Sequence, residues 1–112
     1  MATQEEYACE VREVFSGDDL IAFVDLGVEN LFKKQRLRLA GVDTPNAINA
    51  TGNTEAGQLR TFVRNLTRGR KGKLVIVSRN TNSWVVTLTV ETPEGPVNVN
   101  EYLIGQGYKF QR

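Results

Sequence analysis

The chain has 112 residues, of which 40% are hydrophobic and 24% are charged, the usual balance of a globular protein. This length is enough for one compact domain and too short for two, and no stretch approaches the ~18 consecutive apolar residues of a membrane span. We therefore expect a single self-contained domain over 1–112, with a core from about 7 to 110, and no membrane partner.

The cysteine and histidine counts exclude several kinds of site. Cys9 is the only cysteine, so no internal disulfide can form, which suits a reducing, cytoplasmic compartment. The first ten residues carry three glutamates and no apolar run, unlike a signal peptide. The chain contains no histidine, which excludes serine–histidine and cysteine–histidine nucleophiles and histidine-ligated zinc. Acid–base chemistry would fall to aspartate, glutamate, lysine, tyrosine or a metal-bound water.

Hydrophobic alternation predicts three strands in the first part of the chain, followed by one long helix. The strands are expected at Tyr7–Val14, Leu20–Val24 and Gln35–Leu39. The helix is expected over Thr54–Thr67, because Thr54 can cap it, apolar residues recur at helical spacing, and Gly69 can end it.

Two further strands and a short helix are predicted in the second part. The strands are expected at Leu74–Val77 and Trp84–Val90, with a tight turn at 93–96. Asn98 and Glu101 form a capping pair for a short C-terminal helix that ends near Gly105 or Gly107. Five strands with a helix after the third predict a mainly β fold with α: a five-stranded Greek-key barrel of the OB type.

The net charge of +1 hides an uneven distribution of charges along the chain. Residues 1–32 hold eight of the thirteen acidic residues and one base, whereas residues 56–90 hold seven bases and no acid. Such an acid-free stretch indicates a surface that faces a polyanion. The alternative is that acidic residues distant in the sequence fold back and neutralise these bases.

Acidic and polar residues gather at two predicted turns. Asp18 follows Gly17 at the first turn, and Asp43 and Thr44 follow the third strand. Two carboxylates and a backbone carbonyl suit a hard cation such as calcium, which takes six to eight oxygen ligands. Arg38 is placed to grip a phosphate beside such an ion. The structural alternative is that the aspartates bond the backbone of their own turns.

Taken in order, these residues and their neighbours resemble the staphylococcal nuclease (thermonuclease) family, calcium-dependent phosphodiesterases with an OB-fold. The matching segments are Val14-Phe15-Ser16-Gly17-Asp18, Arg36 to Pro45, Glu55-Ala56 and Val99 to Tyr108. The resemblance implies that Asp18 and Asp43 are calcium ligands and that Thr44 is a third, through its carbonyl. It implies that Arg38 is catalytic, holding the attacked phosphate while a metal-assisted water cleaves DNA or RNA.

Two positions depart from the family pattern. The family's glutamate after Asp-Thr-Pro, which acts on the attacking water, is here Asn46, whose amide cannot take a proton. The family's second arginine is missing, and Trp84 stands in its segment. Losing one charged catalytic group commonly costs ~10²–10⁴ in rate, so we expect a degraded phosphodiesterase site. The alternative is that Asp19 or Glu55 replaces the missing base.

A nucleic-acid contact surface is expected at the basic segment. Arg60, Arg64 and Arg68 recur every four residues, which places them on one helical face, as a contact row or as a solvated face. Trp84 offers a ring on which a base can stack, or else packs on the barrel. The residues assigned to nucleic-acid binding are Arg68, Arg70, Lys71, Lys73, Arg79 and Trp84.

Three functions follow from the sequence. The leading hypothesis is a monomeric OB-fold domain that binds single-stranded DNA or RNA with little or no hydrolysis. The second is an active but slow calcium-dependent nuclease, cutting DNA or RNA at ends or internally. The third is a protein-interaction module on the same fold, since nuclease-like OB domains without an active site occur as scaffolds.

Overall fold

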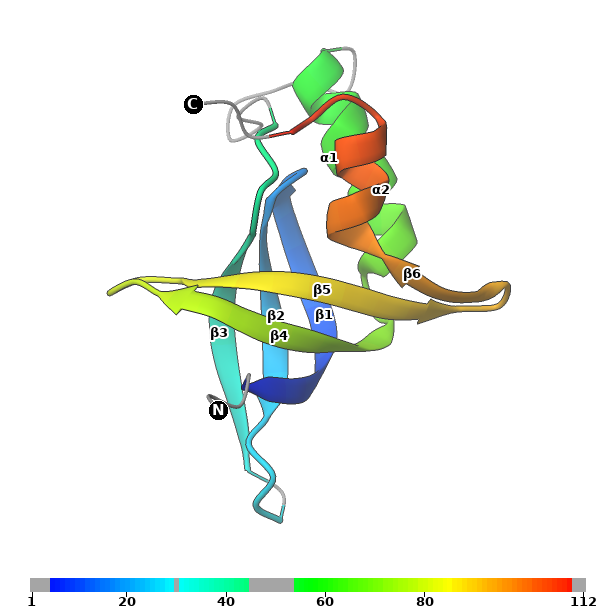
Figure 1. Ribbon diagram of the computed structural model, residues 1–112. Coiled ribbons are helices and arrows are strands. Elements are labelled where there is room, and N and C mark those ends of the chain that lie inside the picture. Colours follow the sequence, from blue (N-terminus) through cyan, green and yellow to red (C-terminus); the bar gives the residue numbers. More distant parts are fainter. Residues whose placement is uncertain (1–4, 30, 45–53, 110–112) are drawn as a thin grey trace.

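Six strands and two helices follow one another in the computed structural model, which describes residues 5–29, 31–44 and 54–109 (Figure 1). The strands are β1 (Glu6–Ser16), β2 (Asp19–Asp25), β3 (Phe32–Leu39), β4 (Lys71–Arg79), β5 (Trp84–Thr92) and β6 (Gly95–Asn98). The helices are α1 (Glu55–Thr67), which precedes β4, and α2 (Val99–Gly105), which follows β6. Neither helix has the length and apolar character that crossing a membrane requires, and the described ranges contain no other.

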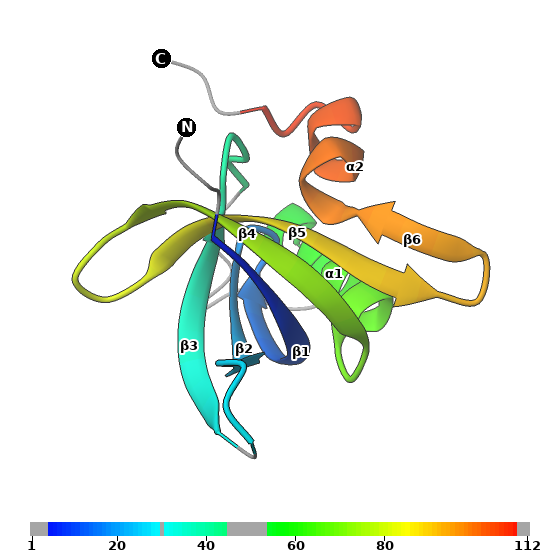
Figure 2. The ribbon, with the colours of Figure 1, turned by 60° about the horizontal axis from the view of Figure 1, so that its bottom comes forward.

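The strands form one sheet that closes on itself. Its order is β3-β2-β1-β4-β5-β6, and β3 also pairs with β5. This parallel pairing joins residues 37–39 to residues 84–86 and closes the first five strands into a barrel (Figure 2). The predicted five-stranded, mainly β barrel is therefore confirmed. The sequence does not predict β6, which begins within the predicted turn at 93–96 and pairs with the end of β5.

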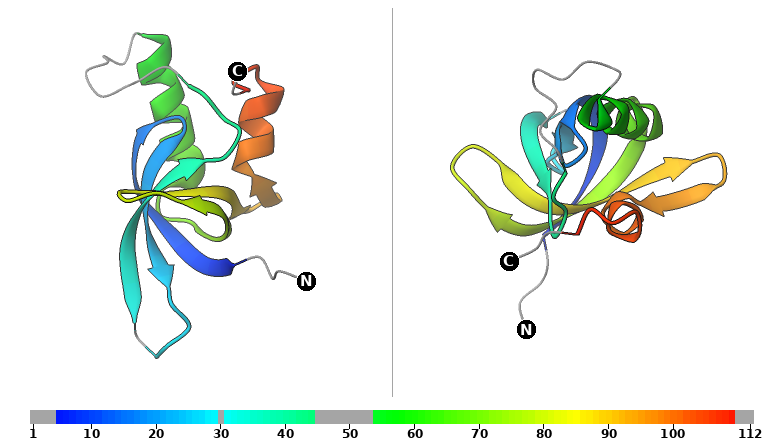
Figure 3. Two further views of the ribbon diagram at one scale, coloured as in Figure 1. Left: turned by 60° about the vertical axis from the view of Figure 1, so that its left-hand side comes forward. Right: turned by 90° about the horizontal axis from the view of Figure 1, so that it is seen from above.

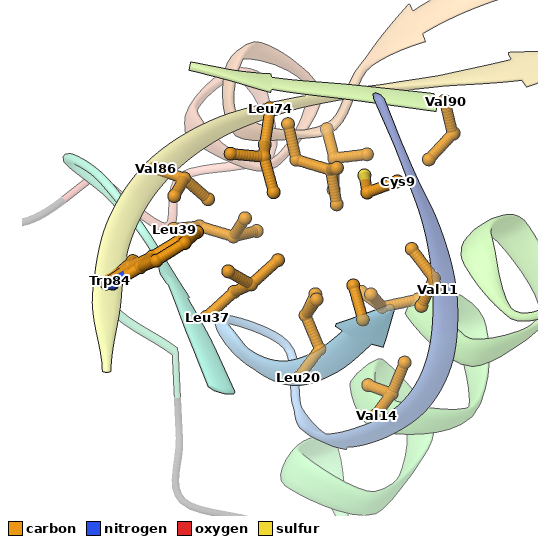
Figure 4. Packing of buried hydrophobic residues seen from close by; sticks show 14 of the residues in the cluster. Cys9, Val11, Val14, Leu20, Leu37, Leu39, Leu74, Trp84, Val86 and Val90 are labelled. Atoms are coloured by element: carbon orange, nitrogen blue, oxygen red, sulfur yellow. The ribbon is translucent and has the colours of Figure 1, made fainter. Parts of the chain in front are cut away.

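The core fills the barrel, because every second side chain of a strand points to the same face. Leu37 and Leu39 are buried. Arg36, which precedes them, and Arg38, which lies between them, are exposed, as the alternation predicts. Figure 4 shows the inward side chains of the surrounding strands meeting in the middle of the barrel. The fully buried core side chains include Val11, Val14, Leu20, Leu74, Val86, Leu88 and Val90.

Both helices begin at the predicted caps. The Thr54 side chain accepts a hydrogen bond from the Gly57 N–H at 3.0 Å, and α1 ends before Gly69, whose φ of 76° is the left-handed conformation that glycine adopts without strain. The Asn98 side chain accepts from the Glu101 N–H at 3.0 Å. The two helices lie at one end of the barrel, and the β2–β3 hairpin projects from the other (Figure 3).

Asn100 joins α2 to the barrel where the barrel closes. Its side chain is buried, and Oδ1 accepts a hydrogen bond from the Leu88 N–H at 2.9 Å. Its Nδ2 donates to the carbonyls of Ala40 at 2.9 Å and Val86 at 3.0 Å. The Ala40 N–H in turn donates to the Val86 carbonyl at 2.8 Å. The asparagine of the C-terminal sequence pattern therefore holds the β3–β5 closure together.

Candidate functional site

The β1–β2 turn, the end of β3 and the segment after β3 bring three predicted site residues together. Asp18 is buried, and its Oδ1 accepts hydrogen bonds from Ser16 Oγ at 3.0 Å and Thr44 Oγ1 at 2.9 Å. Its Oδ2 lies 3.4 Å from Nη2 of Arg38. The Asp18 carboxylate is thus enclosed by donors from the chain itself.

Gly17 allows this turn to approach its neighbours closely. A Cβ at position 17 would lie 2.8 Å from Cγ2 of Thr44 and 2.9 Å from Cδ2 of Leu59. Because these distances are far below ordinary contact, a side chain at position 17 would require the Thr44 and Leu59 side chains to shift. The Gly17-Asp18 pair of the sequence pattern therefore has a packing reason that needs no metal.

The described residues fit a calcium ion poorly. Asp43 is exposed, and its backbone N–H donates to the Tyr108 carbonyl at 2.8 Å. Within residues 5–29, 31–44 and 54–109, no group of three or more acidic or cysteine side chains is placed to hold a metal. Calcium takes six to eight oxygens, and the Asp18 carboxylate is already used by the chain. Asn46 lies outside the described residues, and calcium binding stays a prediction.

A second ion pair lies next to Asp18 in the sequence and was not predicted. Arg36 Nε donates to Oδ1 of Asp19 at 2.9 Å, and its Nη2 donates to Oδ2. Hydrogen bonding to Asp19 raises the pKa of the Arg36 guanidinium. The guanidinium also lies 5.5 Å from the centroid of the Phe15 ring, a cation–π contact. Arg36 and Arg38 remain half exposed, with 45% and 54% of their side chains accessible.

Trp84 packs into the end of the barrel and is only 8% exposed. Its ring stacks on Tyr7 with centroids 6.1 Å apart. Two cations also lie over the indole, Lys33 Nζ at 5.1 Å and the Arg79 guanidinium at 5.2 Å from the ring centroid. The structure thus gives Trp84 the packing position that was the alternative to base stacking. Base stacking stays a prediction, with no open ring face to support it.

The predicted basic surface is largely neutralised by Glu5 and by acids of β1, which follows it. Glu13 lies 3.2 Å from Arg64 and 3.9 Å from Arg68. The other pairs are Glu6 with Lys73 at 3.5 Å and Glu5 with both terminal nitrogens of Arg79. The reason is topological, because β1 runs antiparallel to β4 and beside α1. For these four cations the alternative expectation is therefore the correct one: acids that are distant in the sequence fold back onto the bases.

Two other cations of the segment are not paired with these acids. Within the part of the chain that the structure describes, Arg70 and Lys71 form no ion pair. They lie at the entry to β4, directly after α1. The site residues inferred from sequence therefore fall into three separate places: the Asp18 turn, the Trp84 corner and this strand entrance.

A groove of about 500 Å³ crosses the outer face of the barrel near the β2–β3 hairpin. It is lined mainly by Ala8, Glu10, Phe23, Asp25, Phe32 and Lys71. Phe23 is 37% exposed and Phe32 57%, so two large apolar rings border solvent here. The Arg12 guanidinium lies 4.9 Å from the Phe23 ring centroid and pairs with Glu10 at 2.8 Å. The sequence patterns do not predict this groove.

Comparisons with known proteins identify the fold. No protein-family model matches the chain, and no curated protein matches it. Among solved structures, the chain is similar to the extended Tudor domain TD3 of mouse TDRD1 in complex with a MILI peptide that contains dimethylarginine. The TM-score is 0.70 over 96% of this chain and 94% of that one, at 9% sequence identity. This likeness establishes the fold alone, and gives no support to nuclease activity.

Proposed function

We propose that this chain is a protein-interaction module, a small barrel that binds a peptide segment of a partner protein. The observation that carries the proposal is the likeness, over nearly the whole chain, to a Tudor domain in complex with a peptide. The groove bordered by Phe23 and Phe32 supports it, because exposed large apolar side chains around a concave surface are typical of interaction sites.

The residues of the nuclease-like pattern support the same proposal by their structural roles. The carboxylate of Asp18 is used by Ser16, Thr44 and Arg38, and Gly17 allows the turn to pack closely against Thr44 and Leu59. These contacts account for the pattern without a phosphodiesterase reaction. A fold that keeps these residues for stability is free to use another surface for binding.

Nucleic-acid binding is the second candidate function, and Arg70 and Lys71 favour it. Both cations lie at one strand entrance without an acidic partner in the described ranges. Their neighbours Arg68 and Lys73 are paired with glutamates of β1, so fewer cations are available than the sequence suggests. Affinity for a polyanion falls with each cation that is neutralised beforehand.

A display selection of random peptides on the immobilised chain tests the proposal. Selected peptides, synthesised and titrated in solution, should bind saturably. Phe23→Ala and Phe32→Ala should each weaken binding about tenfold, the cost of losing one well-packed aromatic contact. Phe62→Ala is the matched control, because the exposure of Phe62, 42%, lies between those of Phe23 and Phe32, but Phe62 lies on α1 and does not line the groove.

Two parallel assays decide between the candidates. The chain is titrated with single-stranded DNA at about 50 mM salt, where phosphate contacts are strong. It is also assayed for cleavage with calcium and with a chelator. Failure to select any peptide, or calcium-dependent cleavage that Asp43→Ala abolishes, would overturn the proposal. Tight DNA binding without peptide binding would establish the second candidate instead.

A further inference from the structure

One half of β3 is a free strand edge. β2 pairs with β3 over residues 32–38, whereas β5 pairs with it only over residues 37–39. In the part of the chain that the structure describes, no strand pairs with the second edge of residues 32–36. Figure 2 shows this half of β3 standing at the side of the barrel. Such an edge presents unpaired backbone donors and acceptors to another chain.

The hydrogen-bond alternation identifies which backbone groups face outward. The Leu39 N–H donates to the Asp18 carbonyl at 3.0 Å, so Leu39 bonds toward β2. In an antiparallel pair every second residue exchanges both its bonds with the same partner strand. Lys33 and Gln35 therefore bond to β2, while Lys34 and Arg36 direct N–H and C=O to the free edge.

The Gln35 side chain agrees with this assignment. Gln35 is buried, and its Nε2 donates to the Arg36 carbonyl at 3.1 Å. If the Arg36 carbonyl accepted a hydrogen bond from β2, it would be satisfied without the Gln35 amide. The Arg36 carbonyl thus accepts a hydrogen bond from the chain itself. The N–H groups of Lys34 and Arg36 have no strand partner in the described ranges.

The side chains along this edge are cationic. Lys34, Arg36 and Arg38 alternate on the outer face of β3 and are all exposed. Lys34 has no ion pair among the described residues. Arg36 and Arg38 are paired with Asp19 and Asp18, but the side chains of these two acids are only 11% and 7% exposed. The surface that a partner meets is therefore positive, with the acids lying beneath it.

The side-chain spacing of a strand allows a partner in extended conformation to place its charges opposite this cationic row. Side chains on one face of a strand recur about every 6.6–6.8 Å, and an added strand has the same repeat. Residues directly opposite one another in an antiparallel pair lie about 4.5–5.5 Å apart, and opposite charges there are favourable. Alternate acidic side chains of an added strand would thus face Lys34 and Arg36.

We infer that the free edge of β3 binds an extended acidic segment of a partner protein as an added strand. The partner backbone bonds to Lys34 and Arg36, and its alternate carboxylates face the cationic row. This inference rests on the proposed function and names the chemistry of the partner. Phe32 begins the same strand and lines the groove, so the edge and the groove are continuous.

The test uses a capped octapeptide of alternating threonine and glutamate, added to the full chain. Amide hydrogen exchange, followed residue by residue by NMR, reports strand addition directly. The N–H groups of Lys34 and Arg36 should exchange at least about tenfold more slowly in the complex. Those of Lys33 and Gln35 should not change, because they are already bonded to β2.

Matched variants separate strand addition from simple charge attraction. Lys34→Glu should weaken binding about fivefold or more, whereas Lys109→Glu, the same charge change at an exposed residue after α2 that does not line the groove, should have a much smaller effect. Lys34→Pro should abolish binding while the chain still folds, because proline is tolerated where the N–H faces outward from an edge. If Lys34→Pro does not fold, an octapeptide with two central prolines replaces it and should not bind the unmodified chain.

The outcomes distinguish the inference from the function on which it rests. Unchanged exchange at Lys34 and Arg36 in the complex overturns the inference. Equal affinity for a single-stranded octanucleotide also overturns it, since that would show a general anion surface. If peptides from the display selection bind but leave these amides unprotected, the inference fails and the proposed function stands. If no displayed peptide binds anywhere, the proposed function itself fails.

Discussion

The Thr44 hydroxyl donates to the Asp18 carboxylate at 2.9 Å, which ties the segment after β3 to the β1–β2 turn. Ser16 donates to the same oxygen at 3.0 Å. A buried carboxylate with such donors is satisfied within the fold, whereas a calcium ligand needs its oxygens directed at the ion. Asp18 and Thr44, which both belong to the nuclease-like pattern, therefore contribute to stability.

Asp18→Ala should lower the free energy of unfolding by about 1–3 kcal/mol, because it removes the shared acceptor and leaves polar donors in a buried site. Urea denaturation measures this change. Asp43→Ala is the control, and because Asp43 is exposed its effect should stay within about 0.5 kcal/mol. A turn built mainly to bind metal would behave differently: removing one of its carboxylates would leave the metal-free chain as stable or more stable.

Asn100→Leu should cost about 3 kcal/mol, since the leucine can satisfy none of the backbone groups that the Asn100 side chain bonds at the barrel closure. Chemical denaturation again gives the measurement. Asn65→Leu on the exposed face of α1 is the matched control and should change stability by no more than about 0.5 kcal/mol. Equal effects of the two substitutions would contradict a clamping role for Asn100.

Local patterns predicted the fold because they depend on neighbours in the chain. The alternation that buries Leu37 and exposes Arg38 requires only the two-residue period of a strand. The Thr54 cap depends on a backbone N–H three residues away. β6 was missed because its four residues, Gly95–Asn98, contain a proline and follow a turn, a composition that favours a loop.

The charge arrangement could not be predicted because it depends on strand register. Glu6 meets Lys73 only through the pairing of β1 with β4, which a one-dimensional pattern does not specify. The groove had a signal that was overlooked. In the apolar run Leu20–Val24, alternation with buried Leu20 and Val24 places both Ile21 and Phe23 on the outer face, and apolar side chains that cluster on a surface indicate an interaction site.

The pKa of Glu5 is lowered from its ordinary value of 4.5, mainly by the hydrogen bonds from Arg79. A lowered folded-state pKa means that the stabilisation from this pair is present above pH 4.5 and is lost as the pH falls through the folded pKa. In an NMR titration of the side-chain carboxyl carbons, Glu5 should titrate below 4.5 in the unmodified chain and close to 4.5 in Arg79→Ala.

Glu13 supplies the internal control for this titration. Its pKa is also lowered, but the main cause is the hydrogen bond from the Val14 N–H, with Arg64 and Arg68 adding to it. The Glu13 midpoint should therefore be the same with and without Arg79. A parallel shift of both glutamates in Arg79→Ala would indicate a change in overall charge or fold, and not the loss of one ion pair.

Glu5 and the acids of β1 should suppress nucleic-acid binding by the basic segment. Substituting glutamine for Glu5, Glu6 and Glu13 together releases the cations that these acids now hold, namely Arg64, Arg68, Lys73 and Arg79. Each released cation can neutralise a phosphate, and on single strands each neutralised phosphate adds about 0.7 to the slope of log affinity against log salt. The triple variant should therefore bind single-stranded DNA more tightly than the unmodified chain, with a slope steeper by up to about 3 when all four cations contact phosphates.

A second triple variant decides whether the ion pairs or the net charge causes this gain. Glutamine at Glu91, Glu94 and Glu101 changes the net charge equally, but these acids have no basic partner within the described ranges. It should raise affinity only slightly, because it frees no cation, and long-range effects are weakened by screening beyond ~10 Å at 0.1 M salt. Fluorescence anisotropy with a labelled oligonucleotide over a salt series gives both slopes. If the two variants gain equally, pairing with β1 does not restrain the basic segment, and the unmodified chain would already have these cations free for a polyanion.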